Sequence, residues 1–562
     1  MLRGESGVRR ALEWADRHSH GLERRGVLLF AGVSTLYWAV TGVLAARKLM
    51  WNDELYTYYV TLLPSMRQVW AALLSGGEQT PPFFYFATRV SFDLFGVNHL
   101  SIRLPEMLGF WVMSACLFVF VSRRTSSFPA LSAATFPLVT IVYKYAYEAR
   151  AYGLVLGFAG LALVSWQSAA LGRRRVLSLL CLAISLSGAL SSHYYAIFVI
   201  FPLALGEATR TFMRRRLDVA IWAALVAPAA PFALHLPLMR AGQAYAGAFW
   251  SPPQWLDVPD FYEDLFTPAL VPVAAILVLG VIHAALVRDE PAPAIEAAAS
   301  APPSSATPSS ATPAAEIVVA CGFIVIPVVS VVLAKVATGA FADRYAVPAV
   351  LGFAVLAGFG TAVAFKRHPV MRATAVGCLV GWFALSQARE FVEPTGVSLP
   401  VSRLTIDRPA AWLKAAPGGQ LPVVVADSHT FTVLTHYGSP EIRARIVYLA
   451  DADLALKHLG HNSVERGMLD LLRPWFRMNV VEFEPFVAQH PQFLVYGDFF
   501  RMAFVNWMTP ELQHRGMRLE LLNREGDNLL LLASRHEGEA AGSSARVISP
   551  LEPSSARLPP PR

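Results

Sequence analysis

Long apolar runs recur along most of this chain and give it its dominant pattern. A helix needs about 20 predominantly apolar residues to cross the hydrocarbon core of a bilayer. Runs that approach this length occupy residues 27–45, 105–121, 128–142, 153–171, 176–191, 196–212, 219–238, 269–287, 317–336, 346–365 and 370–386. The pattern predicts a polytopic all-α membrane body of about 11 transmembrane helices over residues 27–388.

Basic residues indicate which ends of these helices lie in the cytoplasm. Residues 1–26 are rich in arginine, and we interpret them as a cytoplasmic N-terminal segment before an uncleaved first helix. With this orientation the even-numbered helices end at cytoplasmic loops. The basic clusters fall in those loops, at 123–124, 173–175, 214–216, Arg288 and 366–367. The positive-inside rule then places the other connections, and everything beyond the last helix, outside the cytoplasm.

The first external loop, residues 50–104, contains a further apolar stretch. Residues 81–96 are only about 16 positions long, short of a full span. They carry Arg89 and Asp93 one helical turn apart, which suits a helix in the membrane interface. Treating the stretch as a span would also place every later basic cluster outside. We therefore expect interfacial helices in this loop, at 81–96 and around 62–74.

Beyond residue 388 the pattern changes. Short β-rich runs at 421–426, 446–449, 493–496, 518–522 and 529–532 alternate with helical stretches such as 464–476. This predicts a small extracytoplasmic α/β domain over residues 389–535. It contains no glycine-rich phosphate loop, and we interpret Asp451-Ala452-Asp453 as a charged turn rather than a metal motif. Residues 289–316 and 536–562 have the composition of a disordered cytoplasmic linker and a disordered tail.

Composition excludes a soluble globular protein. Hydrophobic residues make up 55% of the 562 residues and charged residues only 15%, with a mean hydropathy of +0.44. The short cytoplasmic loops account for the net charge of +7, so it implies no nucleic-acid partner. We expect a multi-pass protein of the bacterial inner (plasma) membrane.

The candidate chemistry lies in polar clusters at the predicted outer helix ends. Asp53 and Glu54 stand in WNDELYTYY, together with Tyr56, just beyond the first helix. Adjacent carboxylates at a membrane boundary are costly to desolvate and commonly functional. Three other outer boundaries carry polar clusters: Lys144, Glu148, Arg150 and Tyr152; His193 and Tyr194; Asp343, Arg344 and Tyr345. Interfacial anchoring by tyrosine is the alternative for each cluster, but their common side predicts one polar cavity.

The motifs occur in a distinctive order along residues 26–365. They are Asp53-Glu54, Pro81-Pro82 followed by aromatics, residues 102–105, residues 147–152, residues 193–195 and Arg344-Tyr345. This order resembles the GT-C membrane glycosyltransferases, and most closely bacterial family 39 and the RgtA/B/C/D-like group, relatives of the protein O-mannosyltransferases and the lipid A aminoarabinose transferase. The resemblance implies sugar transfer from a polyprenyl-phosphate carrier at the extracytoplasmic face, with Asp53 as catalytic base. Relatives often have histidine before the two prolines, and here Thr80 stands there, which puts any role of that histidine in doubt.

A mechanism follows from the chemistry of such a donor. The departing phosphate requires charge neutralisation, for which Arg150 and Arg344 are the candidates, assisted by Lys144 or His193. Asp53 is expected to take the proton of the acceptor hydroxyl in a single inverting displacement. Glu54 and Glu148 are candidates for binding sugar hydroxyls or a divalent cation; an Mg²⁺ or Mn²⁺ ion is optional, with Asp53 and Glu54 as its expected ligands. The full predicted substrate-binding set is Glu54, Tyr56, Lys144, Glu148, Arg150, Tyr152, His193, Tyr194, Arg344 and Tyr345.

Other functions stay open at this stage. A transporter or glycolipid flippase usually has ionisable residues near the bilayer midplane and repeated halves, whereas these acids sit at helix ends. A non-catalytic anchoring protein would tolerate loss of the carboxylates. An enzyme that uses a diphosphate-linked donor is a third alternative. The predicted partners are a polyprenyl-phosphate-linked sugar donor, a lipid, glycan or protein acceptor, and the bilayer.

Overall fold

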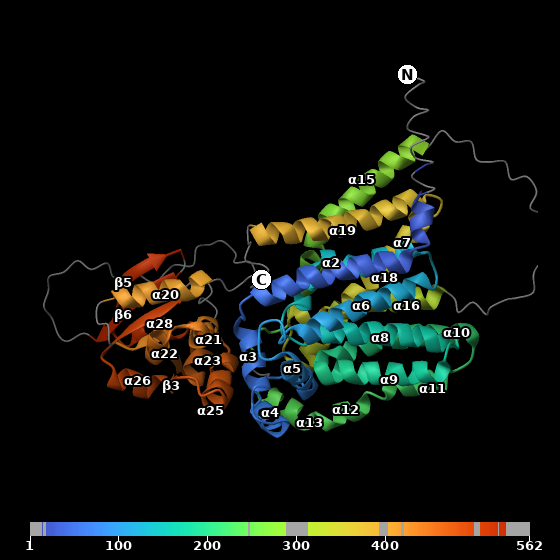
Figure 1. The fold of residues 1–562 in the computed structure, drawn as a ribbon. Coiled ribbons are helices and arrows are strands. Elements are labelled where there is room, and N and C mark those ends of the chain that lie inside the picture. The colour runs from blue at the N-terminus through green and yellow to red at the C-terminus, as the bar shows by residue number, and fades with distance from the viewer. Residues whose placement is uncertain are drawn as a thin grey trace, which may run out of the picture.

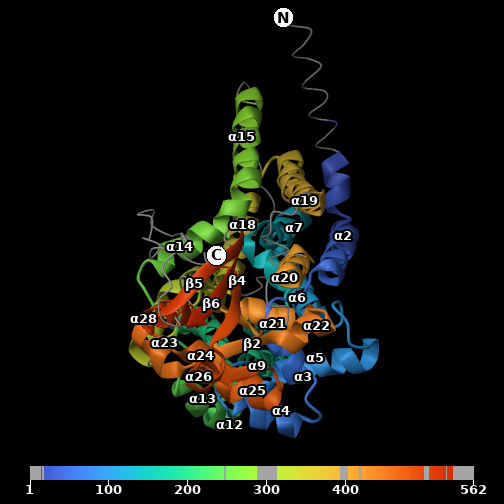
Figure 2. The ribbon, with the colours of Figure 1, turned by 90° about the vertical axis from the view of Figure 1, so that its left-hand side faces the viewer.

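The computed structural model consists of a body of helices with a smaller α/β unit at one end (Figure 1). It describes residues 14, 18–245, 248–287, 313–392, 403–416, 421–498, 506–526 and 528–535. The α/β unit is built from the C-terminal part of the chain and covers the end face of the body (Figure 2). The predicted fold class, a helical body with a small C-terminal α/β unit, is therefore confirmed, whereas the predicted count of about 11 spans is not. The predicted tail at 536–562, and most of the predicted segments 1–26 and 289–316, lie outside the described residues.

Apolar helices form the body. Among the described residues seven are long and apolar enough to cross a membrane, or up to nine if each of two bent pairs is one span. The predicted spans at 128–142 and 346–365 form shorter apolar helices, Ser127–Val139 and Ala349–Ala364. The helices of the body are α2 (Gly26–Arg47), α6 (Leu104–Ser122), α7 (Ser127–Thr135), α8 (Tyr152–Ala170), α9 (Arg175–Ser192), α10 (Ile200–Arg214), α11 (Val219–Val226), α12 (Ala229–Leu234), α13 (Leu236–Gln243), α14 (Asp257–Phe266), α15 (Leu270–Val287), α16 (Pro313–Ile324), α17 (Ile326–Leu333), α18 (Ala349–Ala364) and α19 (Pro369–Val392).

The bends fall at prolines. The helix over Val219–Leu234 turns by 64° into α13, and Ala314–Ile324 turns by 48° into Ile326–Thr338. Pro237 and Pro327 stand in the first turn of the segment after each bend. Proline has no N–H to donate and its ring clashes with the preceding turn, so it ends one helical segment and begins another. The predicted single spans at 219–238 and 317–336 are therefore both broken.

Helices α6 and α8 pack closely and fix the loop before α8. A Cβ atom at Gly157 would lie 2.6 Å from the carbonyl oxygen of Gly109, so only glycine allows this approach. Near the start of α8, the N–H of Leu154 donates to Glu106 Oε2 of α6 at 2.8 Å. The loop before α8, which includes Glu148 and Arg150, is therefore attached to a rigid pair of helices.

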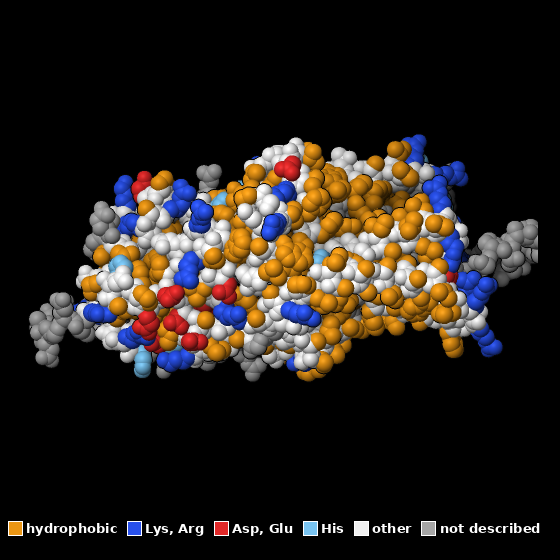
Figure 3. All heavy atoms as spheres, turned by 90° about the horizontal axis from the view of Figure 1, so that it is seen from below, with side chains coloured by type: hydrophobic (Ala, Val, Ile, Leu, Met, Phe, Trp, Pro, Cys, Tyr) orange, Lys and Arg blue, Asp and Glu red, His pale blue; other side chains and the backbone are white. Residues whose placement is uncertain are grey.

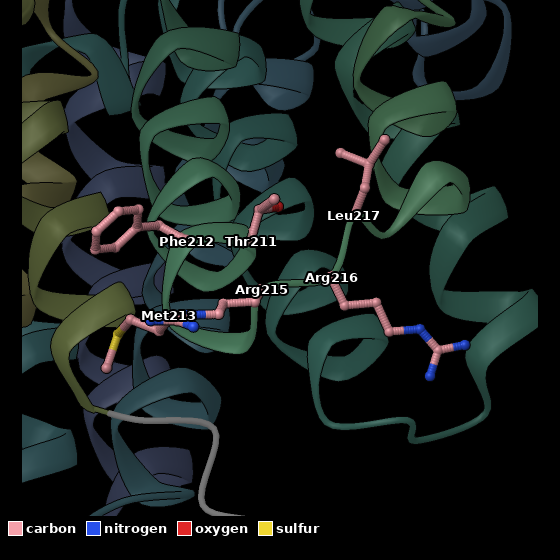
Figure 4. A pocket seen from close by; sticks show the side chains of 6 residues that line it. All are labelled: Thr211, Phe212, Met213, Arg215, Arg216 and Leu217. Carbon is pink, nitrogen blue, oxygen red and sulfur yellow. The ribbon is translucent and has the colours of Figure 1, made fainter.

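Basic side chains gather at one end of the body, with a broad apolar belt between them and the α/β unit (Figure 3). Ion pairs join separate segments there: Arg124 with Glu316 at 2.8 Å and Arg175 with Asp218 at 2.5 Å. An open hollow at the α10–α11 turn is lined by Thr211, Phe212, Met213, Arg215, Arg216 and Leu217 (Figure 4). The basic clusters at 123–124, 173–175, 214–216 and 366–367 therefore share one end, opposite the α/β unit, whereas Arg288 lies outside the described residues.

Glu316 corrects one prediction. The predicted disordered linker, residues 289–316, ends too late, because α16 begins at Pro313 and Glu316 is buried in its first turn. Its carboxylate also accepts a hydrogen bond from Gln167 at 3.1 Å. A buried carboxylate requires such partners, and here Arg124 and Gln167 supply them. Helix α16 can therefore begin before the apolar run at residue 317.

The first external loop contains three helices, α3 (Asn52–Thr61), α4 (Met66–Leu73) and α5 (Pro82–Phe95). Ser65 caps α4 by accepting a hydrogen bond from the N–H of Gln68. Helix α5 begins at the Pro81-Pro82 pair and exposes Phe86, Leu94 and Phe95, as expected for an interfacial helix.

The α/β unit contains a six-stranded mixed sheet in the order β3-β2-β1-β4-β6-β5. Strands β1 to β4 are parallel, and β6 pairs antiparallel with both β4 and β5. The strands are β1 (Val423–Val425), β2 (Ile446–Ala450), β3 (Val480–Glu482), β4 (Gln492–Asp498), β5 (Met517–Glu525) and β6 (Asn528–Arg535). The sequence did not predict β3, because its two valines stand between the polar residues Asn479 and Glu482 and not in a longer apolar run such as the one that contains β1.

Helices surround the sheet. They are α20 (Arg403–Ala415), α21 (Ser428–Tyr437), α22 (Pro440–Arg445), α23 (Ala452–Leu459), α24 (Ser463–Gly467), α25 (Arg473–Trp475), α26 (Phe483–Gln489) and α28 (Met508–His514). Of these, α21, α22 and α23 begin at side-chain caps, Asp427, Ser439 and Asp451. Asp451 accepts hydrogen bonds from the N–H groups of Asp453 and Leu454 at 3.0 and 2.9 Å. It is the N-cap of α23, which agrees with the interpretation of this triplet as a turn.

Candidate active site

The site forms where α3 begins, at the end of the body that meets the α/β unit. Trp51 is extended, and its N–H donates to Glu54 Oε2 at 3.4 Å, which starts the helix. Successive helical residues project about 100° apart, so Asp53 and Glu54 point in different directions. Glu54 is fully buried, whereas the Asp53 side chain is 19% exposed.

Glu54 fixes α3 to the rest of the body. Arg103 donates from Nε and Nη2 to the two carboxylate oxygens of Glu54, both at 2.7 Å, and the N–H of Ala149 donates to Oε1 at 2.8 Å. Burial by itself raises the pKa of Glu54, but Arg103, Lys48 and these hydrogen bonds outweigh burial and lower it to about 2. The prediction that Glu54 contacts substrate is not supported by this position, because its oxygens are enclosed and already bonded.

Arg103 completes the same anchor on its other side. Its Nη1 donates to the carbonyl oxygens of Ala45 at 2.5 Å and Lys48 at 2.8 Å, at the C-terminal end of α2. Carbonyls at a helix C-terminus have no intrahelical partner and carry partial negative charge. A single buried guanidinium therefore joins the end of α2 to the start of α3.

Lys48 and Glu148 extend the anchor toward the loop before α8. Lys48 Nζ lies 3.7 Å from Glu54 Oε2 and 3.9 Å from Glu148 Oε2. Burial raises the pKa of Glu148 more than Lys48 lowers it. Glu148 is 7% exposed. Lys48 is not among the predicted site residues, and its only signal in the sequence is a lysine at the outer end of an apolar run.

Asp53 is the more open of the two carboxylates. Its Oδ2 lies 3.8 Å from Arg344 Nη2, and its Oδ1 accepts a hydrogen bond from Asn52 Nδ2 at 3.3 Å. Burial acts to raise the pKa of Asp53, but the charges of Arg344 and Arg150 prevail and hold the pKa below its ordinary value. Asp53 is therefore ionised at neutral pH.

Arg150 has a carboxylate partner that the sequence analysis missed. Its Nη1 and Nη2 donate to Glu78 Oε2 at 3.1 Å and Oε1 at 3.4 Å. The N–H and hydroxyl of Thr80 also donate to Glu78 Oε1, at 3.0 and 2.6 Å. Thr80, which stands where relatives often have histidine, thus orients Glu78. The only feature of the sequence that could have predicted a role for Glu78 is the presence of an acid shortly before the two prolines. The structure brings Arg150, Glu78 and Asp53 together.

An aromatic wall faces the charged groups. The ring of His193 lies 5.2 Å from the rings of both Tyr152 and Tyr345, and Tyr345 stacks on Tyr195 at 4.2 Å. Burial and the nearby charges of Arg150 and Arg344 lower the pKa of His193 to about 3. His193 is therefore neutral in the free protein, and its help in neutralising a phosphate stays a prediction.

Three predicted residues lie at the margin of this group. Tyr194 points toward His235, with ring centroids 6.0 Å apart, and does not join the wall formed by His193. Lys144 Nζ lies 5.1 Å from the ring of Tyr145 and is partly exposed. Tyr56 packs edge-on against Phe476 of the α/β unit at 6.2 Å. Its pKa is raised by burial and by the carboxylates of Glu78 and Asp53.

Trp250 covers Arg344 from the loop before α14. Its ring lies 5.7 Å from the guanidinium carbon of Arg344. Ser251 holds this loop in place, because its hydroxyl donates to the carbonyl of Phe341 at 2.6 Å. Arg344 Nε is buried with no hydrogen-bond partner among the described residues. Next to it, burial and the acids Asp264 and Asp257 raise the pKa of Asp343 to about 6.

Asp53 and Glu54 do not fit the role of paired metal ligands in this arrangement. Both oxygens of Glu54 bond to Arg103, and Asp53 lies beside two guanidinium groups. Cations of the Mg²⁺ type require accessible oxygen ligands around one centre. No group of three or more His, Cys, Asp or Glu side chains in the described part of the chain is arranged to hold a metal ion.

Comparison with known proteins bears on the fold that carries this site. Residues 79–237 match the family model described as dolichyl-phosphate-mannose-protein mannosyltransferase. The structure is similar to ArnT from Cupriavidus metallidurans in the apo state, with a TM-score of 0.52 and 12% identity, over 90% of this chain and 97% of that chain. The same protein bound to undecaprenyl phosphate gives 0.50 and 12%, with the same coverage.

A weaker likeness links the chain to an oligosaccharyltransferase from Archaeoglobus fulgidus in complex with Zn and sulfate. Its TM-score is 0.42 at 10% identity, over 90% of this chain and 73% of that chain. No curated protein sequence matches. The chain has the GT-C glycosyltransferase fold, which confirms the resemblance seen in the sequence.

The buried anchor gives a first prediction, on stability. Arg103→Met and Glu54→Gln should each destabilise the folded protein by about 3–5 kcal/mol, because each leaves a buried charge without its partner. The measurement is the apparent unfolding temperature of the purified protein in detergent. Arg408→Met is the matched control, since Arg408 pairs with a Glu525 side chain that is 58% exposed and should change stability by less than about 1 kcal/mol.

The anchor also sets the acid sensitivity. The folded pKa of Glu54 is lowered to about 2, so its stabilisation is complete above the ordinary glutamate pKa of about 4.3 and is lost as the pH falls through 2. If the unfolding temperature of Arg103→Met at pH 7 equals that of the wild type, the Arg103–Glu54 pair does not stabilise the folded protein as proposed.

Proposed function

We propose that this protein is an inverting glycosyltransferase that moves a sugar from a polyprenyl-phosphate donor to an acceptor hydroxyl at the extracytoplasmic face of the bacterial inner membrane. The observation that carries the proposal is Asp53. It is a partly exposed carboxylate held ionised between two arginines, at the end of the body away from the basic clusters. The GT-C fold supports the reaction class.

Arg344 is the proposed partner of the donor phosphate. It contacts Asp53 only loosely, at 3.8 Å, and retains a buried Nε–H without a partner in the described structure. Arg150 is more occupied, because Glu78 accepts from both its Nη atoms. Guanidinium groups bind phosphate oxygens in bidentate fashion and stabilise the charge of the departing phosphate. The ArnT structure bound to undecaprenyl phosphate supports a lipid phosphate as the kind of ligand.

Asp53 is the proposed general base. In the free protein the arginines lower its pKa, which makes it a weak proton acceptor. The phosphodiester of the bound donor carries one negative charge that offsets those positive charges, so the pKa of Asp53 rises toward its ordinary value once donor is present. Asp53 then takes the proton of the acceptor hydroxyl as that oxygen attacks the anomeric carbon and the phosphate leaves from the opposite face. Donor binding thereby activates the base.

The aromatic wall is the proposed sugar-binding side of the site. Tyr152, His193 and Tyr345 present ring faces beside the charged groups. Neutral His193 and the tyrosine hydroxyls suit sugar hydroxyl groups, and aromatic rings pack against the apolar face of a pyranose. A flippase would need the lipid-linked sugar to leave unreacted, so covalent product in proteoliposomes separates the two functions.

Asp53→Asn tests the base directly. The amide keeps the shape and the contact with Asn52 but does not accept a proton, so transfer should fall by about 10²–10⁴-fold. The assay uses the polyprenyl-phosphate sugar pool extracted from the source organism as donor, with envelope material as acceptor and mass spectrometry of the product. Asp93→Asn on α5, an exposed acid in the same loop, is the control. Full activity of Asp53→Asn would exclude Asp53 as base.

Arg344→Gln should raise the donor KM and lower kcat, because it removes the charge that the phosphate contacts. Arg344→Lys should recover only part of the loss, since lysine lacks the bidentate geometry. Direct binding of undecaprenyl phosphate, followed by native mass spectrometry, checks the same contact without the reaction. Arg67→Gln, an exposed arginine of α4, should leave both measurements unchanged. Equal donor affinity in Arg344→Gln and wild type would refute the assignment.

The pH profile distinguishes Asp53 from its acidic neighbours. Because the pKa of Asp53 is lowered, kcat/KM should show no acid limb between about pH 5 and 7. Glu148 has a raised pKa and Asp343 titrates at about 6, so either of them as base would produce a limb nearer that range. If the wild-type kcat/KM falls between pH 5 and 7 and this fall disappears in Glu148→Gln or Asp343→Asn, the substituted residue is the general base.

A further inference from the structure

Helix α21 of the α/β unit packs directly on α3, although about 380 residues separate the two in sequence, as the bond between Thr432 and Asn52 shows. Val433 shares a buried apolar cluster with Met50, Leu55 and Ile102. At the end of α21, the hydroxyl of Tyr437 accepts a hydrogen bond from the N–H of Met50 at 2.8 Å. The α/β unit is therefore fixed to the segment that carries Asp53.

A chain of hydrogen bonds leads from α21 to the Asp53 carboxylate. The hydroxyl of Thr432 donates to Asn52 Oδ1 at 2.8 Å, with the carbonyl oxygen of His429 as a longer second acceptor at 3.0 Å. Asn52 Nδ2 in turn donates to Asp53 Oδ1 at 3.3 Å. Thr432 is fully buried and Asn52 is 8% exposed. A carboxylate only accepts hydrogen bonds, so the amide must turn its NH₂ group toward Asp53 and its oxygen toward Thr432. The threonine hydroxyl is the group that meets that oxygen.

The same face of α21 carries a second residue beside the site. His429 precedes Thr432 by three positions, which places both on one side of the helix. His429 is exposed, and its ring meets the edge of Trp51 at 6.2 Å. The charged and titratable groups around Asp53 are Arg344, Arg150, Glu78, Glu148, His429 and the tyrosines Tyr56, Tyr145 and Tyr345. The α/β unit supplies one of them.

We propose that Thr432 is a positioning residue for Asp53, acting through the side-chain amide of Asn52, so that the α/β unit completes the active site. This inference rests on the proposed role of Asp53 as base. Without the threonine hydroxyl the Asn52 amide loses the partner that fixes its orientation, and the Asp53 carboxylate loses a steady hydrogen-bond donor. The carboxylate then samples other rotamers, and the fraction of complexes aligned for proton transfer falls.

Thr432→Val tests the chain with a side chain of the same shape. Loss of one hydrogen bond in a positioning chain should lower kcat by about fivefold, with undecaprenyl phosphate binding unchanged. Thr432→Ser, which restores the hydroxyl, should recover most of the rate. Thr435→Val is the matched control on the same helix, because its buried hydroxyl has no partner in the described part of the chain.

A double variant gives the specific signature. Asn52→Ala should lower kcat by a similar factor, and Thr432→Val should have no further effect in the Asn52→Ala background, because the chain is already broken. Additive losses, or equal losses in Thr432→Val and Thr435→Val, would overturn the positioning role.

A measurement that does not depend on sugar transfer separates this inference from the proposed function. Carbodiimide modifies protonated carboxyl groups, so the pH dependence of Asp53 labelling, read by peptide mass spectrometry, reports its titration. The labelling curve should move to higher pH in Thr432→Val and Asn52→Ala and stay in place in Thr432→Ser. An unmoved curve overturns the inference. A moved curve in an enzyme whose Asp53→Asn variant is fully active would instead contradict the proposed function alone.

Discussion

The buried pair of Arg103 and Glu54 is the interaction on which the rest of the site depends. Taking two charges out of water is costly, and the bidentate geometry with further hydrogen bonds to Ala45, Lys48 and Ala149 offsets that cost. The pair joins the end of α2, the start of α3, the start of α6 and the loop before α8. Because the side chain of Glu54 points inward to Arg103, the side chain of the adjacent residue on the helix, Asp53, points in a different direction, toward Arg344.

The charged pairs of the site form a gradient from enclosed to open. Glu54 with Arg103 is fully buried, Arg150 with Glu78 is slightly exposed, and Asp53 with Arg344 is the loosest and most exposed pair. Enclosed pairs hold the backbone, whereas a loose pair with an unsatisfied guanidinium N–H is available to a charged ligand. The same order explains why adjacent carboxylates with the same covalent chemistry have different roles.

The α/β unit is joined to the membrane body by more than the chain. Residues of α3, α4 and α5 share one buried apolar cluster with residues of β1, β2 and β4. Tyr245 of the body also donates a hydrogen bond to Asp470 of the unit at 2.7 Å. An apolar interface of this kind fixes relative position, which is what a residue such as Thr432 needs if it is to act on Asp53 from another part of the sequence.

The sequence by itself determined the apolar helices, the common end of their basic clusters and the polar residues at the opposite end. These features are local, since hydropathy and charge act on neighbouring residues, and they led to Asp53, Arg150 and Arg344. Tertiary structure alone decided which carboxylate of the Asp53-Glu54 pair is buried, that Glu78 and Lys48 join the site, and that Tyr194 points away from it. It also decided the breaks at Pro237 and Pro327 and the contact of Thr432 with Asn52. Each of these depends on contacts between residues far apart in the chain, and a local sequence pattern does not predict such contacts.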